Sequence, residues 1–261
     1  MQIILASAKI MNAQSNRKLP FFTHPKFEQQ AQRFALELGE YNIDELSKIL
    51  KCNLSIAREN KLRYMDFFNE ENKLPAIFAY YGQVYKCLKA SELSEESLSY
   101  ANKHLWLLSF LYGMLRPSDS IHPYRLEGKM KLKENGRKTM FAHWKPLLTN
   151  LLIDSVKADG GTLLHLATEE FEHLFDWQRV KNALKIIQPQ FLVNDGCKLK
   201  NITVYAKSCR GAMTRYAIEQ RISNVLELQQ FEYEGFRFKK ADFEVDNYQP
   251  GIHRMLWTLD T

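Results

Sequence analysis

The sequence predicts an α+β fold, a mixed α/β arrangement in which helices surround a mixed sheet within a single domain over residues 1–261. Short apolar runs of strand length alternate with amphipathic helical segments along the whole chain, as in mixed folds. The chain shows no internal repeat, and 11 Gly in 261 residues leave no glycine-rich linker. Its 45% hydrophobic content, with 16 Phe, 12 Tyr and 4 Trp, supplies a large core.

The first half of the chain is expected to start with one strand and continue mainly as helices. Apolar periodicity predicts strands at residues 2–6 and 75–80 and helices at residues 25–38, 43–52 and 54–68. Gly82 is expected to end the second strand. Ser94, followed by Glu95 and Glu96, predicts a helix N-cap with acidic residues in the first turn.

The second half is expected to alternate more regularly. Apolar runs predict strands at residues 106–110, 162–167, 185–193 and 202–205. Helices are predicted at residues 141–157 and 207–222. The C-terminal segments 231–238 and 254–259 resemble edge strands.

The composition excludes several classes of protein. The apolar stretch at residues 3–6 stops at Ser7 and has no basic segment before it, so it does not resemble a secretory signal. No run approaches the roughly 20 apolar residues of a membrane-spanning helix. The four cysteines form no C-x-x-C pair. We therefore expect a cytoplasmic protein, without membrane contact, whose thiols are reduced.

The net charge of +6 is concentrated in two segments. Residues 116–145 hold eight Lys or Arg against three acids, and residues 198–221 hold six against one, so each segment carries +5. The rest of the chain is therefore net acidic. This pattern indicates a shared site for an anionic partner, although two solvated basic faces would give the same pattern.

The densest motif is LYGMLRP at residues 111–117, followed by PYRLE at 123–127. Gly113 allows a tight turn, and the two prolines restrict the chain around it. Such turns would hold Arg116 and Arg125 for bidentate contacts to phosphate or carboxylate. Tyr124 could add a hydroxyl donor. The alternative is a structural turn in which the arginines pair with Asp119 and Glu127.

A second basic group is expected on the helix that we predict to begin near Lys207. Lys207, Arg210, Thr214 and Arg221 would share one face of it. At a helix start, free N–H groups and the helix dipole favour an anion, which predicts a phosphate site. A solvated basic face is the alternative reading.

Ser7 and Lys9 directly follow the first predicted strand. Ser7 could be a nucleophile if a base activated it, or the segment could be a strand-end turn with a charged exit. Metal binding has less support, because His165, Glu169, Glu170 and His173 supply only one E-x-x-H step and a di-iron site needs two. We expect no metal and no cofactor. Cys209, between two cations, could have a lowered pKa and react with peroxide, or be an ordinary thiol.

The order of the motifs resembles the YaaA family. LYGMLRP and PYRLE match its central blocks, and four further blocks fall in matching order: residues 7–9 (S-A-K), 81–85 (Y-G-x-V-Y), 166–171 (L-A-T-E-E-F) and 205–211 (Y-A-K-x-x-R-G). The resemblance covers nearly the whole chain. Two positions depart from the family pattern: Thr168 replaces Ser and keeps its hydroxyl, whereas Phe171 replaces Tyr and loses one.

The resemblance implies a cytosolic protein of the peroxide stress response that limits free intracellular iron and so protects DNA. It also implies a positively charged cleft, a helix-hairpin-helix-like element and DNA binding. Carried over to the matching blocks, it places eight residues with Arg116 at the site: Ser7, Lys9, Tyr85, Tyr124, Arg125, Glu170, Lys207 and Arg210.

Two functions remain open at this point. The cleft could follow the DNA backbone with weak sequence preference, as the extra cations Lys129, Lys131, Lys133, Arg137 and Lys138 suggest. It could instead be the active site of an enzyme for a small anionic or nucleotide-like substrate. Ser7, Lys9, Glu170 and Lys207 would then be the catalytic candidates. In either case we expect a monomer.

Overall fold

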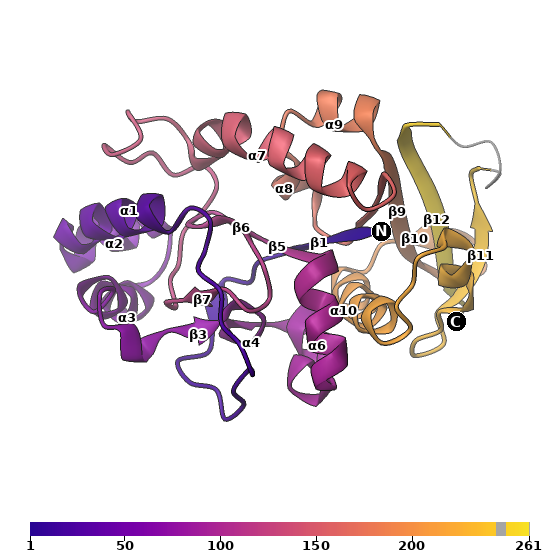
Figure 1. Cartoon of the computed structure of the whole chain (residues 1–261), viewed down its shortest axis with the longest axis horizontal. Coiled ribbons are helices and arrows are strands. Elements are labelled where there is room, and N and C mark those ends of the chain that lie inside the picture. Colours follow the sequence, from indigo (N-terminus) through magenta and orange to yellow (C-terminus); the bar gives the residue numbers. More distant parts are fainter. Residues whose placement is uncertain (244–248, 261) are drawn as a thin grey trace.

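An eight-stranded mixed sheet runs through the computed structural model, which describes residues 1–243 and 249–260 (Figure 1). Its strands follow the order β11-β12-β9-β8-β1-β5-β6, and β10 pairs with β9. They are β1 (Gln2–Ala6), β5 (Leu105–Ser109), β6 (Gly113–Leu115), β8 (Thr162–His165), β9 (Lys185–Asn194), β10 (Leu199–Lys200), β11 (Arg237–Ala241) and β12 (Gly251–Asp260). Short strands β2 (Ile10–Met11), β3 (Leu74–Pro75), β4 (Tyr80–Tyr81) and β7 (Ser120–Ile121) form two small sheets. The predicted mixed fold is confirmed.

The five central strands are parallel, and their order decides where a ligand can bind. β1 pairs in parallel with both β5 and β8, and β9 pairs in parallel with both β8 and β12. Numbered along the chain, these strands have the order 2-1-3-4-5, which is a doubly wound order. The chain leaves β1 toward β5 on one side and later returns to β8 on the other. The carboxyl ends of β1 and β8 therefore form the switch point at which such sheets bind ligands.

Helices cover both faces of this sheet (Figure 1). They are α1 (Glu28–Glu40), α2 (Ile43–Leu50), α3 (Leu54–Met65), α4 (Ala76–Ala79), α5 (Gln83–Leu88), α6 (Glu95–His104), α7 (Met140–Lys157), α8 (Glu169–Glu172), α9 (Trp177–Ala183) and α10 (Thr203–Glu219). Short 3-10 helices lie at η1 (Glu70–Asn72), η2 (Ala90–Glu92) and η3 (Val225–Gln230). In Figure 1, α7 to α9 lie above the central strands and α6 and α10 below them.

Local capping explains why several predicted helices begin where they do. The Asn42 side chain accepts the N–H of Glu45, whose carboxylate accepts the N–H of Asn42, so α2 starts with a capping box. Ser94 accepts the N–H of Ser97 at 3.1 Å, which confirms the N-cap predicted for α6. Thr139 caps α7 in the same way.

The core follows from strands that are apolar on both faces. β1 is buried except at its last residue, and all of β5 is buried, as expected for parallel strands covered by helices on both sides. Gly113 lies in the left-handed region at φ 76°, and a Cβ there would lie 3.0 Å from the ring of the buried Trp144. The tight turn predicted at Gly113 is therefore confirmed, and close packing explains why it is glycine.

Two predicted strands are wrong. Residues 75–80 form the end of β3, the buried turn of helix α4 and the start of β4. A short run that is apolar all round does not distinguish a buried strand from a buried helix. Residues 203–205 belong to the first turn of α10, although β-branched residues there are typical of strands. The helix predicted to begin near Lys207 therefore begins at Thr203.

The C-terminal strands also differ from the prediction. Residues 254–259 lie in β12, which is an internal strand because it pairs with β9 on one side and β11 on the other. Of the predicted strand 231–238, only the last two residues belong to β11. The helix predicted at 25–38 is present as α1, displaced by two or three residues.

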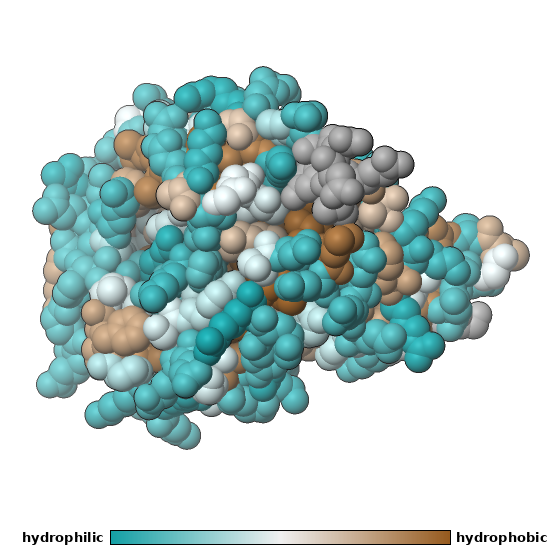
Figure 2. All heavy atoms as spheres, turned by 45° about the vertical axis from the view of Figure 1, so that its right-hand side comes forward, coloured by the Kyte–Doolittle hydropathy of each residue, from teal (hydrophilic) through white to brown (hydrophobic). Residues whose placement is uncertain are grey.

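The surface of the molecule is largely polar on the face that Figure 2 draws. Figure 2 shows hydrophilic side chains over most of one face, with apolar residues in smaller groups between them. In the part of the chain that the structure describes, no helix is long and apolar enough to cross a membrane. The single-domain assignment and the helix-hairpin-helix-like element stay predictions.

Candidate functional site

A pocket of about 390 Å³ opens at the carboxyl ends of β1, β5 and β8, which is the switch point of the sheet. Three of the segments that line it directly follow these strands, and others come from the start of α5, from residues 124–127 and from α10. Eight of the nine predicted site residues line it: Ser7, Lys9, Tyr85, Tyr124, Arg125, Glu170, Lys207 and Arg210. The fold thus brings together residues that are up to 203 positions apart in the printed sequence.

Arg116 is the exception, and its predicted place in this site is wrong. Its guanidinium donates to the Gln2 side chain at 3.1 Å and to the Leu105 carbonyl at 3.2 Å, and lies 3.3 Å from the centre of the Trp106 ring. Gln2 and Leu105 are the first residues of β1 and β5, so Arg116 lies at the opposite edge of the sheet from the pocket. Burial lowers the pKa of Arg116 to about 10, and the residue has a structural role.

One wall of the pocket is an ion-pair network centred on Glu127. Its carboxylate lies 3.0 Å from the Lys9 ammonium and 3.3 Å from the Arg125 guanidinium. The Arg125 side chain is only 14% exposed, whereas that of Lys9 is 64% exposed. The alternative interpretation, in which Arg125 pairs with Glu127, is therefore correct for that pair. One carboxylate shared by two cations leaves this wall with one net positive charge.

Tyrosine hydroxyls fix the floor of the pocket. The Tyr85 hydroxyl donates to the Ala6 carbonyl at 2.9 Å, which ties α5 to the end of β1. The Tyr124 hydroxyl lies 2.6 Å from the Ser109 hydroxyl and 2.9 Å from the Tyr80 hydroxyl. Burial raises the pKa of both Tyr85 and Tyr124 above the ordinary value. They stay neutral at physiological pH and act as hydrogen-bonding anchors.

This geometry bears on the chemistry open to Ser7. A serine nucleophile needs a base to take its proton. Tyr124, which lines the same pocket as Ser7, has a pKa raised by burial and keeps its own proton, so it does not supply that base. Lys9 is paired with Glu127 and mostly exposed. Neither Tyr124 nor Lys9 thus supports a nucleophilic Ser7, and the role of this serine at the end of β1 stays a prediction.

The second wall is α10, which carries the free positive charge of the site. Among residues 1–243 and 249–260, no carboxylate lies within 4.0 Å of the Lys207 or Arg210 side-chain nitrogens. Burial lowers the pKa of Arg210, and the charge of Glu169 partly opposes this effect. The guanidinium is thus half-buried without a carboxylate of its own, an arrangement that favours an incoming anion.

The predicted surroundings of these two cations need correction. Lys207 and Arg210 lie in the second turn of α10 and not at the helix start, so the N–H groups of the first turn are not beside them. Thr214 is fully buried. Arg221 follows the end of the helix and pairs with Glu96 at 2.7 Å. The anion site predicted on α10 therefore consists of side chains alone.

Close packing between α10 and α5 explains why position 211, beside Arg210, is glycine. A Cβ at Gly211 would lie 2.0 Å from the carbonyl oxygen of Val84, so α10 touches the backbone of α5 there. Only glycine permits this approach. The contact brings the α10 cations onto the wall that Val84 and Tyr85 form. The glycine thus acts as a packing device for the site.

The segment after β8 completes the pocket. Glu170 is exposed at its edge, in the short helix α8. The Phe171 ring is 6% exposed and stacks on Phe110, with centroids 4.6 Å apart and planes at 14°. Phe110 was not predicted as a site residue, although its position at the end of a predicted strand could have indicated it. Where the family motif has Tyr, this chain therefore places an apolar ring in the pocket.

Two further hypotheses, a peroxide-reactive Cys209 and a metal site near His165, gain no support from this geometry. Cys209 is fully buried, and burial raises the pKa of its thiol to about 12, so the proposal that nearby cations lower it is wrong. His165 pairs with Glu172 at 3.1 Å. In the described part of the chain, no group of three or more His, Cys, Asp or Glu could hold a metal ion.

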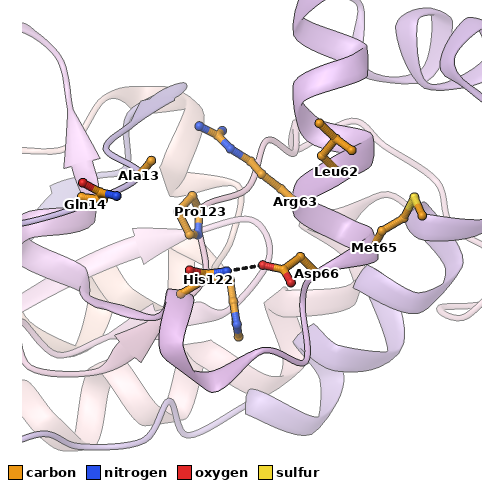
Figure 3. Close-up of a pocket in the computed structure, with 9 residues that line it drawn as sticks. Ala13, Gln14, Leu62, Arg63, Met65, Asp66, His122 and Pro123 are labelled. Carbon is orange, nitrogen blue, oxygen red and sulfur yellow. Dashed lines mark hydrogen bonds between the residues drawn. The ribbon is translucent and has the colours of Figure 1, made fainter.

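A second hollow, of about 550 Å³, lies between α3 and residues 122–123 (Figure 3). Figure 3 shows Arg63 and Leu62 on the helix facing Gln14 and Pro123 across it. Arg63 is paired with Glu59 at 2.6 Å. None of the predicted site residues lines this hollow, which separates it from the switch-point pocket.

Fold and pocket together define a mixed α/β protein that presents a cation-lined pocket at the switch point of a doubly wound sheet. The chain belongs to the family described as "Peroxide stress protein YaaA", which matches residues 1–242. A UPF0246 protein of Bacteroides fragilis is 45% identical over 241 residues, covering 92% of this chain and 94% of its own length. UPF0246 proteins of Bacteroides thetaiotaomicron and Aliivibrio fischeri are 42% and 35% identical, and each alignment covers 94% of the relative. The family membership predicted from the motifs is confirmed.

Proposed function

We propose that this protein acts in the bacterial response to peroxide by binding DNA through the switch-point pocket and the basic loop beside it. The observation that carries the proposal is the pair Lys207 and Arg210, which have no carboxylate within 4.0 Å among the described residues. Cations that are not neutralised internally are available to phosphates. Phosphate contacts supply most of the affinity of non-specific DNA binding.

The loop at residues 128–139 extends this charge beyond the pocket. It follows Glu127 directly and carries five cations: Lys129, Lys131, Lys133, Arg137 and Lys138. The buried Glu37 anchors it, since its carboxylate accepts the N–H groups of Lys133 and Glu134 at 2.8 Å each. An anchored basic loop beside a cationic pocket offers more positive charge than a small substrate requires.

Salt dependence tests the proposal. The affinity for duplex DNA should fall with salt, with a log–log slope of about −0.9 per phosphate neutralised. Lys207→Ala and Arg210→Ala should each weaken binding about equally across sequences and reduce the slope by roughly one unit. Glu170→Ala should leave binding intact or tighten it. Lys157→Ala, at an exposed lysine outside the pocket, is the control. Binding that ignores salt would contradict the proposal.

The cellular part of the proposal concerns iron. In a cytoplasmic protein of this family, loss of the gene should sensitise cells to peroxide and raise free iron, and an iron chelator should restore survival. The described residues hold no metal-binding cluster, so we propose that the effect on iron is indirect. A deletion strain with normal peroxide survival and unchanged free iron would contradict this part.

The second candidate function is an enzyme acting on a small anionic or nucleotide-like substrate. The observation that favours it is the position of Glu170 among the cations of the pocket. A protein that only binds the phosphate backbone gains nothing from a carboxylate there, because the carboxylate repels phosphate. An enzyme can use the same carboxylate to take up or release a proton. The test is turnover of a panel of nucleoside phosphates and its loss in Glu170→Gln, with Glu40→Gln as the exposed control. Turnover that Glu170→Gln leaves unchanged would reject this site as the catalytic one.

A further inference from the structure

The interior of the switch-point pocket differs from a simple phosphate groove. Its volume of about 390 Å³ lies in the range of pockets that hold one small ligand, roughly 300–1,000 Å³, and a duplex does not fit. Val84, Leu126, Leu166, Phe110 and Phe171 give it apolar walls. Backbone phosphates alone do not require apolar walls, so this interior suits a flat, largely apolar group.

The aromatic part of these walls is held rigidly. Phe110 and Phe171 stack on each other, and Phe110 also makes an edge contact with Phe141 at 5.5 Å. Both stacked rings are at least 94% buried while contributing to the pocket lining. Aromatic and apolar side chains of this kind receive bases that have left the helical stack.

The polar groups are divided between two positions. Lys207 is exposed and Arg210 is half-buried on the α10 wall, whereas Glu170 is exposed on α8. Cations suit a phosphate, and a carboxylate accepts hydrogen bonds from the amino and imino groups of a base. Apolar walls, two free cations and one acceptor together match the parts of a nucleotide.

We propose that the pocket receives a single nucleotide extruded from DNA, with its base against the apolar walls and its phosphate on Lys207 and Arg210. This inference rests on the proposed function, because the surrounding DNA must be held by the basic loop at residues 128–139 beside the pocket. Extrusion requires unpairing and unstacking, and DNA with an unpaired nucleotide has already lost that pairing. The protein should therefore prefer DNA with an unpaired nucleotide over fully paired DNA.

The test compares a labelled duplex carrying one unpaired thymidine with the same duplex fully paired, at equal salt. Wild type should bind the first about 10- to 100-fold more tightly. Val84→Trp fills the pocket and should abolish this preference. Leu147→Trp, at an exposed position of α7, is the matched control and should keep it. A preference that survives Val84→Trp, or equal affinity of wild type for both DNAs, overturns the inference while salt-dependent binding leaves the proposed function standing.

Two further measurements keep the inference falsifiable if Val84→Trp fails to fold. Glu170→Gln, at an exposed position, should change the order of affinity among unpaired A, C, G and T, and Glu40→Gln should not. Free thymidine monophosphate should compete only weakly, because it lacks the flanking phosphates. If it binds as tightly as the DNA does, the ligand is a free nucleotide and extrusion is rejected. If no DNA binds at any salt, the proposed function itself fails.

Discussion

Replacing Gly211 with alanine tests whether the contact between α10 and α5 builds the pocket. The new Cβ would lie 2.0 Å from the Val84 carbonyl oxygen and 2.8 Å from its carbon. Both are backbone atoms, so no flexible side chain can yield, and the helices must separate by roughly 1.4 Å to reach an ordinary contact. That displacement moves Lys207 and Arg210 away from the wall that Val84 forms.

Two opposing effects determine the expected change in the free energy of unfolding of Gly211→Ala. Overpacking costs about 1–3 kcal/mol, and a rigid backbone neighbour places this case at or above the upper end. Alanine in a helix interior gains up to about 1 kcal/mol over glycine. We therefore expect a net loss of about 2 kcal/mol, which for a chain of this size lowers the Tm by about 4–8 °C. DNA affinity should fall as well.

Thermal unfolding and DNA titration of the same samples measure both effects. Gly39→Ala is the matched control, because it also lies in a helix and its Cβ would meet only ordinary contacts at 3.7 Å or more. That variant should keep or slightly raise the Tm. A Gly211→Ala protein that melts no lower than wild type would refute the reasoning, since the helices would then not be in the close contact described.

Two other variants and one labelling experiment address stability and reactivity. Burial raises the pKa of Asp119 from 3.8 to about 6, so the charged form is disfavoured in the fold and stability should fall by about 3 kcal/mol as the pH rises from about 4 to 6. Urea unfolding of wild type and Asp119→Asn should show this slope only in wild type. Glu37→Gln should cost about 2 kcal/mol and increase proteolysis within residues 128–139, because two backbone N–H groups lose a charged acceptor. Iodoacetamide at pH 8 should label the exposed Cys197 in the native protein and spare Cys209, and early labelling of Cys209 would contradict its burial.

Much of the fold could be predicted because local signals agreed with the tertiary structure. The Ser94 cap and the apolar runs of β1, β5, β8 and β9 each have a local physical cause that the sequence shows. Residues 75–80 and 203–205 could not be predicted, because the same apolar or β-branched residues suit a strand or a helix until their neighbours are known. The parallel order of strands was also beyond local reasoning.

The site, like the fold, could be predicted only in part. The family resemblance predicted eight of the residues that line the pocket, but it could not distinguish them from Arg116, which belongs to one of the same motifs. The distinction lies in which end of a strand a residue occupies. Arg116 reaches back to Gln2 and Leu105 at the amino ends of β1 and β5, whereas Tyr124 and Arg125 reach the carboxyl ends. Only the fold reveals this difference.

Strand order explains why the motifs are dispersed along so much of the chain. In a sheet whose parallel strands follow the order 2-1-3-4-5, the ends of β1 and β8 lie side by side although about 160 residues separate them. S-A-K follows β1, L-A-T-E-E-F follows β8, and Gly211 holds the third motif, on α10, against α5. Each motif therefore supplies one wall, and none can form the pocket alone. A packing change that removes no charge, such as Gly211→Ala, should then impair binding as much as the loss of a cation does.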